Sequence, residues 1–176
     1  MSRADLASEA ASLRPRLGTD PVLSATKTSL RLLGRRVLAL DDEKAELDAL
    51  LDELVTAAAP DLLAVYGVGV DTAALLLVAA GDNPDRLRNE AAWAHLCGVS
   101  PIQASSGEVT RHRVNRSGDR QADHALWRIA ITRMGSDART RDYVERRLAQ
   151  GKSKPEIIRM LKRYIARETY RVLPRN

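Results

Sequence analysis

The amino-acid sequence predicts an all-α protein, with a long N-terminal coiled-coil helix before a compact helical domain that contains a helix-hairpin-helix and a basic loop. Only 3% of the residues are aromatic and Phe is absent, so the core must consist of Leu, Val, Ile and Ala, a composition that favours helices. Leucines recur at heptad spacing from Leu30 onward. In the second half, Gly and Pro separate several segments of helical length. With 176 residues, 44% of them apolar, the chain can bury a substantial core.

Residues 1–21 predict a weakly ordered start, because Pro15, Gly18 and Pro21 interrupt them. A coiled-coil helix is expected over residues 22–59, and Pro60 ends it. Its narrow apolar seam favours pairing with a second copy, as a homodimer or higher oligomer, over packing within one molecule. The acidic residues of this helix lie mostly outside the seam and indicate a solvated face rather than a metal site. The seam consists of Leu30, Leu33, Val37, Leu40, Lys44, Leu47, Leu51 and Leu54.

The compact domain is expected over residues 60–176 and begins with DLLAVYGVGVDTAALLLVAAGD, residues 61–82. A short apolar helix, a tight turn at Gly67 and Gly69, and an Ala/Leu helix opened by Asp71 and Thr72 form the pattern of a helix-hairpin-helix. Such glycines let a phosphate approach main-chain N–H groups at the second helix's N-terminus, so Gly67, Gly69 and Thr72 are candidate DNA contacts. A purely structural turn needs the same glycines, and Asp71 places a negative charge near that terminus.

Four further helices are expected, over residues 90–96, 119–135, 138–150 and 154–172. The last begins with a capping box of Ser153 and Glu156. Along it, arginines repeat every fourth residue, which indicates either a nucleic-acid backbone contact or a solvated face partly paired with Glu156 or Glu168. These arginines are Arg159, Arg163, Arg167 and Arg171.

Charge is distributed unevenly: residues 107–176 carry a net +10, whereas residues 1–106 carry −5. A concentrated basic field is the electrostatic signature of nucleic-acid binding; the alternative is a charged, soluble surface. The single cysteine, Cys97, excludes an internal disulfide and is interpreted as a packing residue. Neither a secretory signal nor an apolar run of transmembrane length occurs, so we expect a cytoplasmic protein without a membrane partner.

The loop GVSPIQASSGEVTRHRVNRSGDR, residues 98–120, could carry chemistry. A serine that attacks a phosphodiester needs a proton acceptor, neutralisation of the transition state's charge and stabilisation of the leaving oxygen. Arginines suit the second need, and His112 is either a proton acceptor or a phosphate contact. Local chemistry alone favours a Ser-Gly turn in a DNA-binding loop. The candidate residues are Ser105, Ser106, Arg111, His112, Arg113, Arg116 and Arg120.

Two long stretches of the sequence together resemble the C-terminal domain of DEDD-type insertion-sequence transposases. The first runs from LLAVYGVGVDTAALL through ASSGEVTRHRVNRSGDRQADHALWRIAITRM, and the second is DARTRDYVERRLAQGKSKPEIIRMLKRYIARETYRVL. That group includes pilin-gene invertases and recombinases guided by a bridge RNA. The resemblance covers residues 61–173, and the preceding heptad helix is similar to the family's linker coiled coil. Tyr66 and Glu108 depart from the pattern, standing where the family more often has proline and a basic residue.

The resemblance implies that Ser106, or otherwise Ser105, is the nucleophile that becomes covalently joined to a DNA phosphate, with Arg111, Arg113 and Arg116 holding that phosphate or a guide RNA. It also implies an N-terminal RuvC-like domain with four acidic ligands for Mg²⁺. Residues 1–60 contain no strand pattern of that kind, so we expect a C-terminal part of a longer transposase, with no cofactor or metal in this chain.

The sequence therefore predicts a part of a transposase that binds DNA and guide RNA and carries the serine for strand cleavage and rejoining. The isolated chain is expected to bind nucleic acid without recombining it. One alternative is a non-catalytic helix-hairpin-helix DNA-binding module whose serines only shape a turn. Another is a coiled-coil assembly protein with an incidental basic face.

Overall fold

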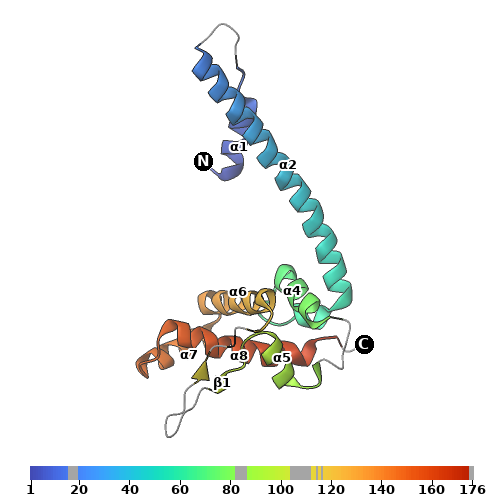
Figure 1. Ribbon diagram of the computed structural model, residues 1–176, viewed down its shortest axis with the longest axis vertical. Helices are drawn as coiled ribbons and strands as arrows, with labels where there is room; N and C mark the ends of the chain where they lie inside the picture. Colours follow the sequence, from blue (N-terminus) through green and yellow to red (C-terminus); the bar gives the residue numbers. More distant parts are fainter. Residues whose placement is uncertain (16–19, 82–86, 104–111, 114, 116, 175–176) are drawn as a thin grey trace. The chain divides into compact units, whose positions relative to one another are not determined.

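The computed structural model describes residues 1–15, 20–81, 87–103, 112–113, 115 and 117–174 (Figure 1). The all-α prediction is confirmed. The chain forms two compact units, Met1–Leu50 and Leu51–Asn176, which divide within the longest helix. The elements are α1 (Arg3–Ser12), α2 (Pro21–Ala58), α3 (Pro60–Leu63), α4 (Val70–Ala80), α5 (Glu90–Leu96), β1 (Ile102–Gln103), β2 (His112–Arg113), α6 (Arg120–Ser136), α7 (Ala138–Ala149) and α8 (Lys154–Val172).

The first unit contains α1, where a weakly ordered start was expected. Ser2 caps this helix, because its hydroxyl accepts a hydrogen bond from the Asp5 N–H while the Asp5 carboxylate accepts one from the Ser2 N–H. Ala7 is buried against α2 at Gly34, where an added Cβ would lie 2.6 Å from the Ala7 carbonyl oxygen. The capping box at Ser2 and the contact with Gly34 thus hold residues 3–12 as a helix, although Pro15, Gly18 and Pro21 nearby predict an irregular segment.

Helix α2 matches the long helix expected over residues 22–59. Most of its heptad leucines are exposed, and Leu33, Leu47 and Leu54 are each more than 60% accessible, whereas Leu51 packs partly against the core of the second unit. At the polar seam position, Lys44 forms an ion pair with Asp48 one turn later. The apolar seam is therefore present on the surface, and its pairing with a second copy remains a prediction.

The core of the second unit lies between α4, α6 and α8, and α5 packs on α8 (Figure 1). Val55 and Ala59 are buried in this core, which is why the unit begins inside α2 and before Pro60. Almost all of its apolar side chains are aliphatic, as the composition predicted. The largest fully buried apolar ones are Leu62, Leu76, Trp93, Leu126, Ile129, Ile157 and Ile165.

A buried hydrogen bond between two side chains joins α5 to α8. The indole N–H of Trp93 donates to the Thr169 hydroxyl at 3.2 Å, and that hydroxyl donates to the carbonyl oxygen of Ile165 at 3.0 Å. Cys97 is fully buried beside them in the core. Burial, reinforced by the nearby carboxylates of Asp119 and Asp123, raises the pKa of the Cys97 thiol far above its usual range. The interpretation of Cys97 as a packing residue is confirmed.

Helices α5 to α8 begin and end within one residue of the expected boundaries. The N-caps of α5, α6 and α7 are Asn89, Asp119 and Asp137, and the side chain of each accepts a hydrogen bond from a main-chain N–H in the first turn. At the start of α8, the Glu156 carboxylate accepts the Ser153 N–H, as the predicted capping box requires. None of the helices in the described ranges is both long and apolar enough to cross a membrane.

Candidate nucleic-acid interface

Helix α8 presents two different faces to its surroundings. Ile157, Leu161 and Ile165 are buried against the core. A second face carries the arginines at every fourth position, accompanied by Met160 and by Tyr164, whose side chain is 44% exposed. Because residues four apart share a helix face, α8 displays a row of cations next to a row of apolar side chains.

The base of the basic loop is closed by two glycines. Gly98 has φ +71°, and a Cβ added to Gly118 would overlap the backbone of Gly98. The Asp119 N–H also donates to the Leu96 carbonyl oxygen at 2.6 Å, which holds the end of the loop to the end of α5. Only glycine permits so close an approach of two backbones. The loop therefore leaves and re-enters the domain at one point.

A buried asparagine reinforces this closure. The Asn115 amide donates to the His95 carbonyl oxygen at 3.0 Å, and its own oxygen accepts both the N–H and the hydroxyl of Ser117.

Further along the loop, β1 pairs antiparallel with β2, with Ile102 opposite Arg113 and Gln103 opposite His112. The sequence predicted a loop here without strands, because two-residue pairs are too short to produce a periodic pattern.

A cavity of about 840 Å³ lies between the base of the loop and α8; we call it the basic cavity. One wall is formed by residues 98–101 and Asn115, from both ends of the loop. The opposite wall is the cationic face of α8, extended by Lys152 in the preceding turn. Its cationic lining consists of Lys152, Arg159, Lys162, Arg163 and Arg167.

Acidic residues neutralise part of this lining. Glu90, at the start of α5, contacts Arg163 at 2.7 Å and Arg167 at 3.0 Å. Partial desolvation acts to raise the pKa of Glu90, but the two guanidinium groups outweigh it and hold that pKa below its usual value. Lys162 pairs with Asp123. The stripe is thus partly paired, though with Glu90 rather than with the expected Glu156 or Glu168.

Arg159 and Lys152 form no salt bridge with another residue in the described part of the chain. Glu156 also lines the cavity, and its carboxylate accepts hydrogen bonds from the N–H and the hydroxyl of Ser153 at 2.9 and 2.7 Å. These Ser153 hydrogen bonds, helped by the charges of Lys152 and Arg159, lower the pKa of Glu156. The two cations therefore remain available to an anion, although the ionised carboxylate of Glu156 lies near them.

A second, separate hollow of about 530 Å³ lies at the turn between α3 and α4, residues 64–69, which we call the glycine turn. Gly67 has φ +79°, a conformation that L side chains rarely adopt, whereas nothing lies within 4 Å of a Cβ added to Gly69. The Thr72 hydroxyl accepts the Gly69 N–H at 3.0 Å. Arg128 of α6 reaches the hollow and pairs with Asp71 at 3.3 Å, which offsets the unfavourable charge of Asp71.

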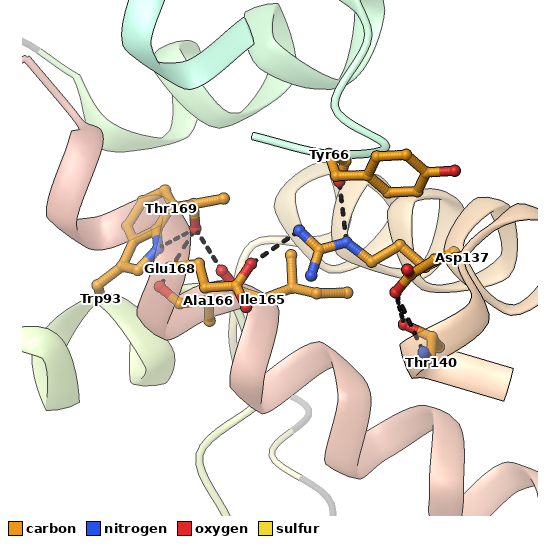
Figure 2. A network of polar contacts seen from close by, with 9 residues as sticks. Tyr66, Trp93, Asp137, Thr140, Ile165, Ala166, Glu168 and Thr169 are labelled. Atoms are coloured by element: carbon orange, nitrogen blue, oxygen red, sulfur yellow. Dashed lines mark hydrogen bonds and ion pairs between the residues drawn. The ribbon is translucent and has the colours of Figure 1, made fainter. Parts of the chain in front are cut away.

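The glycine turn is fastened to the core by a buried guanidinium. Arg133, with 11% of its side chain exposed, donates from Nε to the Tyr66 carbonyl oxygen at 2.9 Å and from Nη2 to Glu168 at 2.8 Å. Figure 2 shows the two contacts that this guanidinium makes, one with Tyr66 and one with Glu168, together with the Trp93–Thr169 pair. A turn that carries candidate contacts is thereby linked to α8, although the two hollows remain distinct.

The structure describes only some of the predicted site residues. Gly67, Gly69 and Thr72 line the hollow at the glycine turn, whereas Arg159, Arg163 and Arg167 line the basic cavity. Arg120 is exposed in the first turn of α6. His112 and Arg113 are described only by the backbone pairing of β2, and Ser105, Ser106, Arg111 and Arg116 lie outside the described residues.

Several residues of these surfaces were missed from the sequence. Lys152 and Tyr164 line the basic cavity, Glu90 balances its charge, and Arg128 lines the other hollow. Only Tyr164 carried a signal, because it lies at helical spacing beside the arginine stripe. The others approach from different elements and could not be placed without the tertiary contacts. Within the described ranges, no three His, Cys, Asp or Glu side chains gather closely enough to hold a metal ion.

Comparison with known proteins places these surfaces in a family context. Residues 59–145 match the family described as Transposase IS116/IS110/IS902. The chain is 32% identical over 134 residues to the insertion element IS110 uncharacterized 43.6 kDa protein of Streptomyces coelicolor, an alignment covering 74% of this chain and 33% of that protein. It is 27% identical over 139 residues to the insertion element IS900 uncharacterized 42 kDa protein of Mycobacterium paratuberculosis, covering 77% and 35%. The chain spans about a third of the length of these curated relatives.

Proposed function

Because these similarities support an insertion-sequence transposase, we propose that this chain is the part of such an enzyme that binds DNA and carries the nucleophilic serine for strand cleavage and rejoining. The observation that carries the proposal is the basic cavity, in which both ends of the serine-bearing loop face the cationic side of α8. Polyanionic DNA is the partner that such a lining favours, since neutralising its phosphates releases counterions.

In the proposed reaction, the Ser106 hydroxyl attacks a backbone phosphorus. A bond forms between the serine oxygen and phosphorus, and the bond from phosphorus to the leaving strand's oxygen breaks. A base accepts the serine proton, and the departing oxygen takes up a proton. The phosphoserine ester retains the energy of the phosphodiester, so the reverse attack by a strand hydroxyl rejoins DNA without ATP. Ser105 is the alternative nucleophile.

Two partners extend this proposal. The resemblance to bridge-RNA-guided recombinases makes a guide RNA a second nucleic-acid ligand of the same basic surfaces. The exposed heptad leucines of α2 support assembly through a coiled coil with a second copy. Any Mg²⁺-dependent RuvC-like domain belongs to the longer protein, and no metal is assigned to residues of this chain.

A second function, a non-catalytic helix-hairpin-helix that binds the DNA backbone, is favoured by the glycine turn. Gly69 leaves open space before α4, where a phosphate could approach the N-terminus of an 11-residue helix. In this alternative the serines only shape the loop.

One experiment separates the two functions. In the full-length transposase, Ser106→Ala should abolish the covalent protein–DNA product while leaving DNA affinity within about twofold. If Ser105→Ala does so instead, Ser105 is the nucleophile, and if neither change affects the product, the catalytic proposal is wrong. DNA affinity of this chain should fall steeply with added salt; an affinity independent of salt would contradict the binding proposal as well.

A further inference from the structure

The basic cavity contains an exposed aromatic ring beside its cations. Tyr164 is 44% exposed and lies at the cavity wall among Met160, Val99 and Pro101. The ring of Tyr164 makes an edge-to-face contact with Tyr143, with centroids 5.9 Å apart and planes at 86°. Arg147 in turn stands over the Tyr143 ring, 5.1 Å from its centroid. The ring of Tyr164 is thus held by α7 at the edge of a cationic cavity.

Cations and an aromatic ring lie at adjacent positions on one helix. Arg159 and Arg163 are four residues apart, as are Met160 and Tyr164, so the two rows run side by side along α8. A nucleotide has a matching division, since its phosphate is anionic and its base has an apolar face. Bases stack on exposed aromatic side chains wherever the π-face of the base is accessible.

Accessibility of that face distinguishes unpaired from paired strands. In a duplex both faces of each base are covered by neighbouring pairs, and only phosphates, sugars and base edges reach the protein. A hollow of about 840 Å³ also has room for one nucleotide. The Tyr164 hydroxyl can donate a hydrogen bond to a phosphate of either strand form, whereas the face of its ring can stack only on a base that is unpaired.

We infer that the basic cavity holds one unpaired nucleotide, with the base stacked on Tyr164 and the phosphate at Arg159 and Lys152. The inference rests on the proposed nucleic-acid binding and adds to it a preference for a strand whose bases are unpaired. DNA and RNA strands share this chemistry, and separate probes distinguish them.

The test measures binding of the full chain to three fluorescently labelled probes of one sequence: a single-stranded DNA, a single-stranded RNA and a blunt DNA duplex. Tyr164→Leu should weaken binding to a single strand about 5- to 150-fold, the loss of one base–aromatic stack, and leave duplex binding within about twofold. Tyr164→Phe keeps the ring and should bind like the parent. Trp127→Leu removes an aromatic side chain of similar exposure, on α6 and outside the cavity, and should leave the affinity for single strands unchanged.

A single-stranded probe containing 2-aminopurine gives an independent readout, because stacking quenches its fluorescence. The parent and Tyr164→Phe should quench it, and Tyr164→Leu should not. Whichever single strand binds more tightly with this Tyr164 dependence identifies the ligand as DNA or RNA. Equal losses on single strand and duplex, or no loss with Tyr164→Leu, would overturn the inference while leaving the proposed function intact. Failure to bind any of the three probes would overturn both.

Discussion

Arg133 and Tyr66 are joined by a hydrogen bond of 2.9 Å from the guanidinium Nε to the main-chain carbonyl oxygen, across 67 positions of sequence. The aliphatic stem of Arg133 also supports the turn, since its Cγ lies 3.3 Å from a Cβ placed on Gly67. The same guanidinium pairs with Glu168 on α8. One side chain thus holds the glycine turn against two helices of the core.

Replacing Arg133 by Met should destabilise the second unit by about 1–3 kcal/mol, because the Tyr66 carbonyl loses its buried donor and Glu168 loses its partner. Urea unfolding followed by circular dichroism measures the change. Arg128→Met, which removes a more exposed guanidinium from the same helix, is the matched control and should cost less than half as much. Equal costs for the two variants would show that Arg133 has no special role.

Gly118→Ala should destabilise the protein by about 1–3 kcal/mol, because the new methyl group would overlap the backbone of Gly98 and force the base of the loop apart. Gly135→Ala is the control, since nothing lies within 4 Å of a Cβ at that position in α6. That change should stabilise the helix by about 0.5–1 kcal/mol. Thermal unfolding of both variants tests the contrast, and a neutral Gly118→Ala would disprove the close contact.

Glu90→Gln should strengthen nucleic-acid binding severalfold, because Arg163 and Arg167 lose their carboxylate partner and become available to phosphates. Fluorescence anisotropy with one DNA probe at several salt concentrations measures affinity and its salt dependence. Glu145→Gln changes net charge equally on an exposed part of α7 and serves as the control. An equal gain from both variants would mean that net charge, not the release of these arginines, is responsible.

Asp137→Asn should lower the melting temperature at neutral pH. The Thr140 hydroxyl, which donates to the Asp137 carboxylate at 2.6 Å, is the main cause of the lowered pKa of this N-cap. Because the pKa is lower in the folded than in the unfolded state, the stabilisation is fully present above the usual value of 3.8 and disappears as pH falls through the lowered pKa.

The melting difference between parent and Asp137→Asn should therefore shrink on acidification below that value. Repeating the comparison in a Thr140→Val background provides the control, because without the hydroxyl donor the difference should already be smaller at neutral pH. A difference that stays constant with pH would contradict the assigned cause.

Leu40→Asp combined with Leu47→Asp should convert an assembly of the chain to monomers, because both positions belong to the exposed seam of α2. Sedimentation equilibrium measures the mass. Ala39→Asp combined with Glu46→Asp alters exposed residues of α2 outside the seam and should leave the mass unchanged. A monomeric parent protein would refute the proposed pairing.

Local signals account for most of the fold that could be predicted. Capping and helix-ending residues act within a few positions, so several boundaries follow from the sequence. Ser153 with Glu156 predicts the start of α8, Pro60 the end of α2, and Gly151 the end of α7. The same reasoning failed at α1, where a reciprocal cap and a contact with Gly34 outweigh the neighbouring Pro15. The strands β1 and β2 were missed because their pairing joins residues 9 and 11 positions apart without a periodic pattern.

The amino-acid sequence alone determined the helical class, the positions of the later helices, the exposed seam of α2 and the arginine repeat along α8, because each depends on spacing within one segment. Tertiary structure alone decided that Glu90 neutralises two of those arginines, that Gly98 and Gly118 meet at the base of the loop, and that Tyr164 lies at the edge of a cationic cavity. These relationships join residues from different elements, and only packing of the core brings them within contact distance.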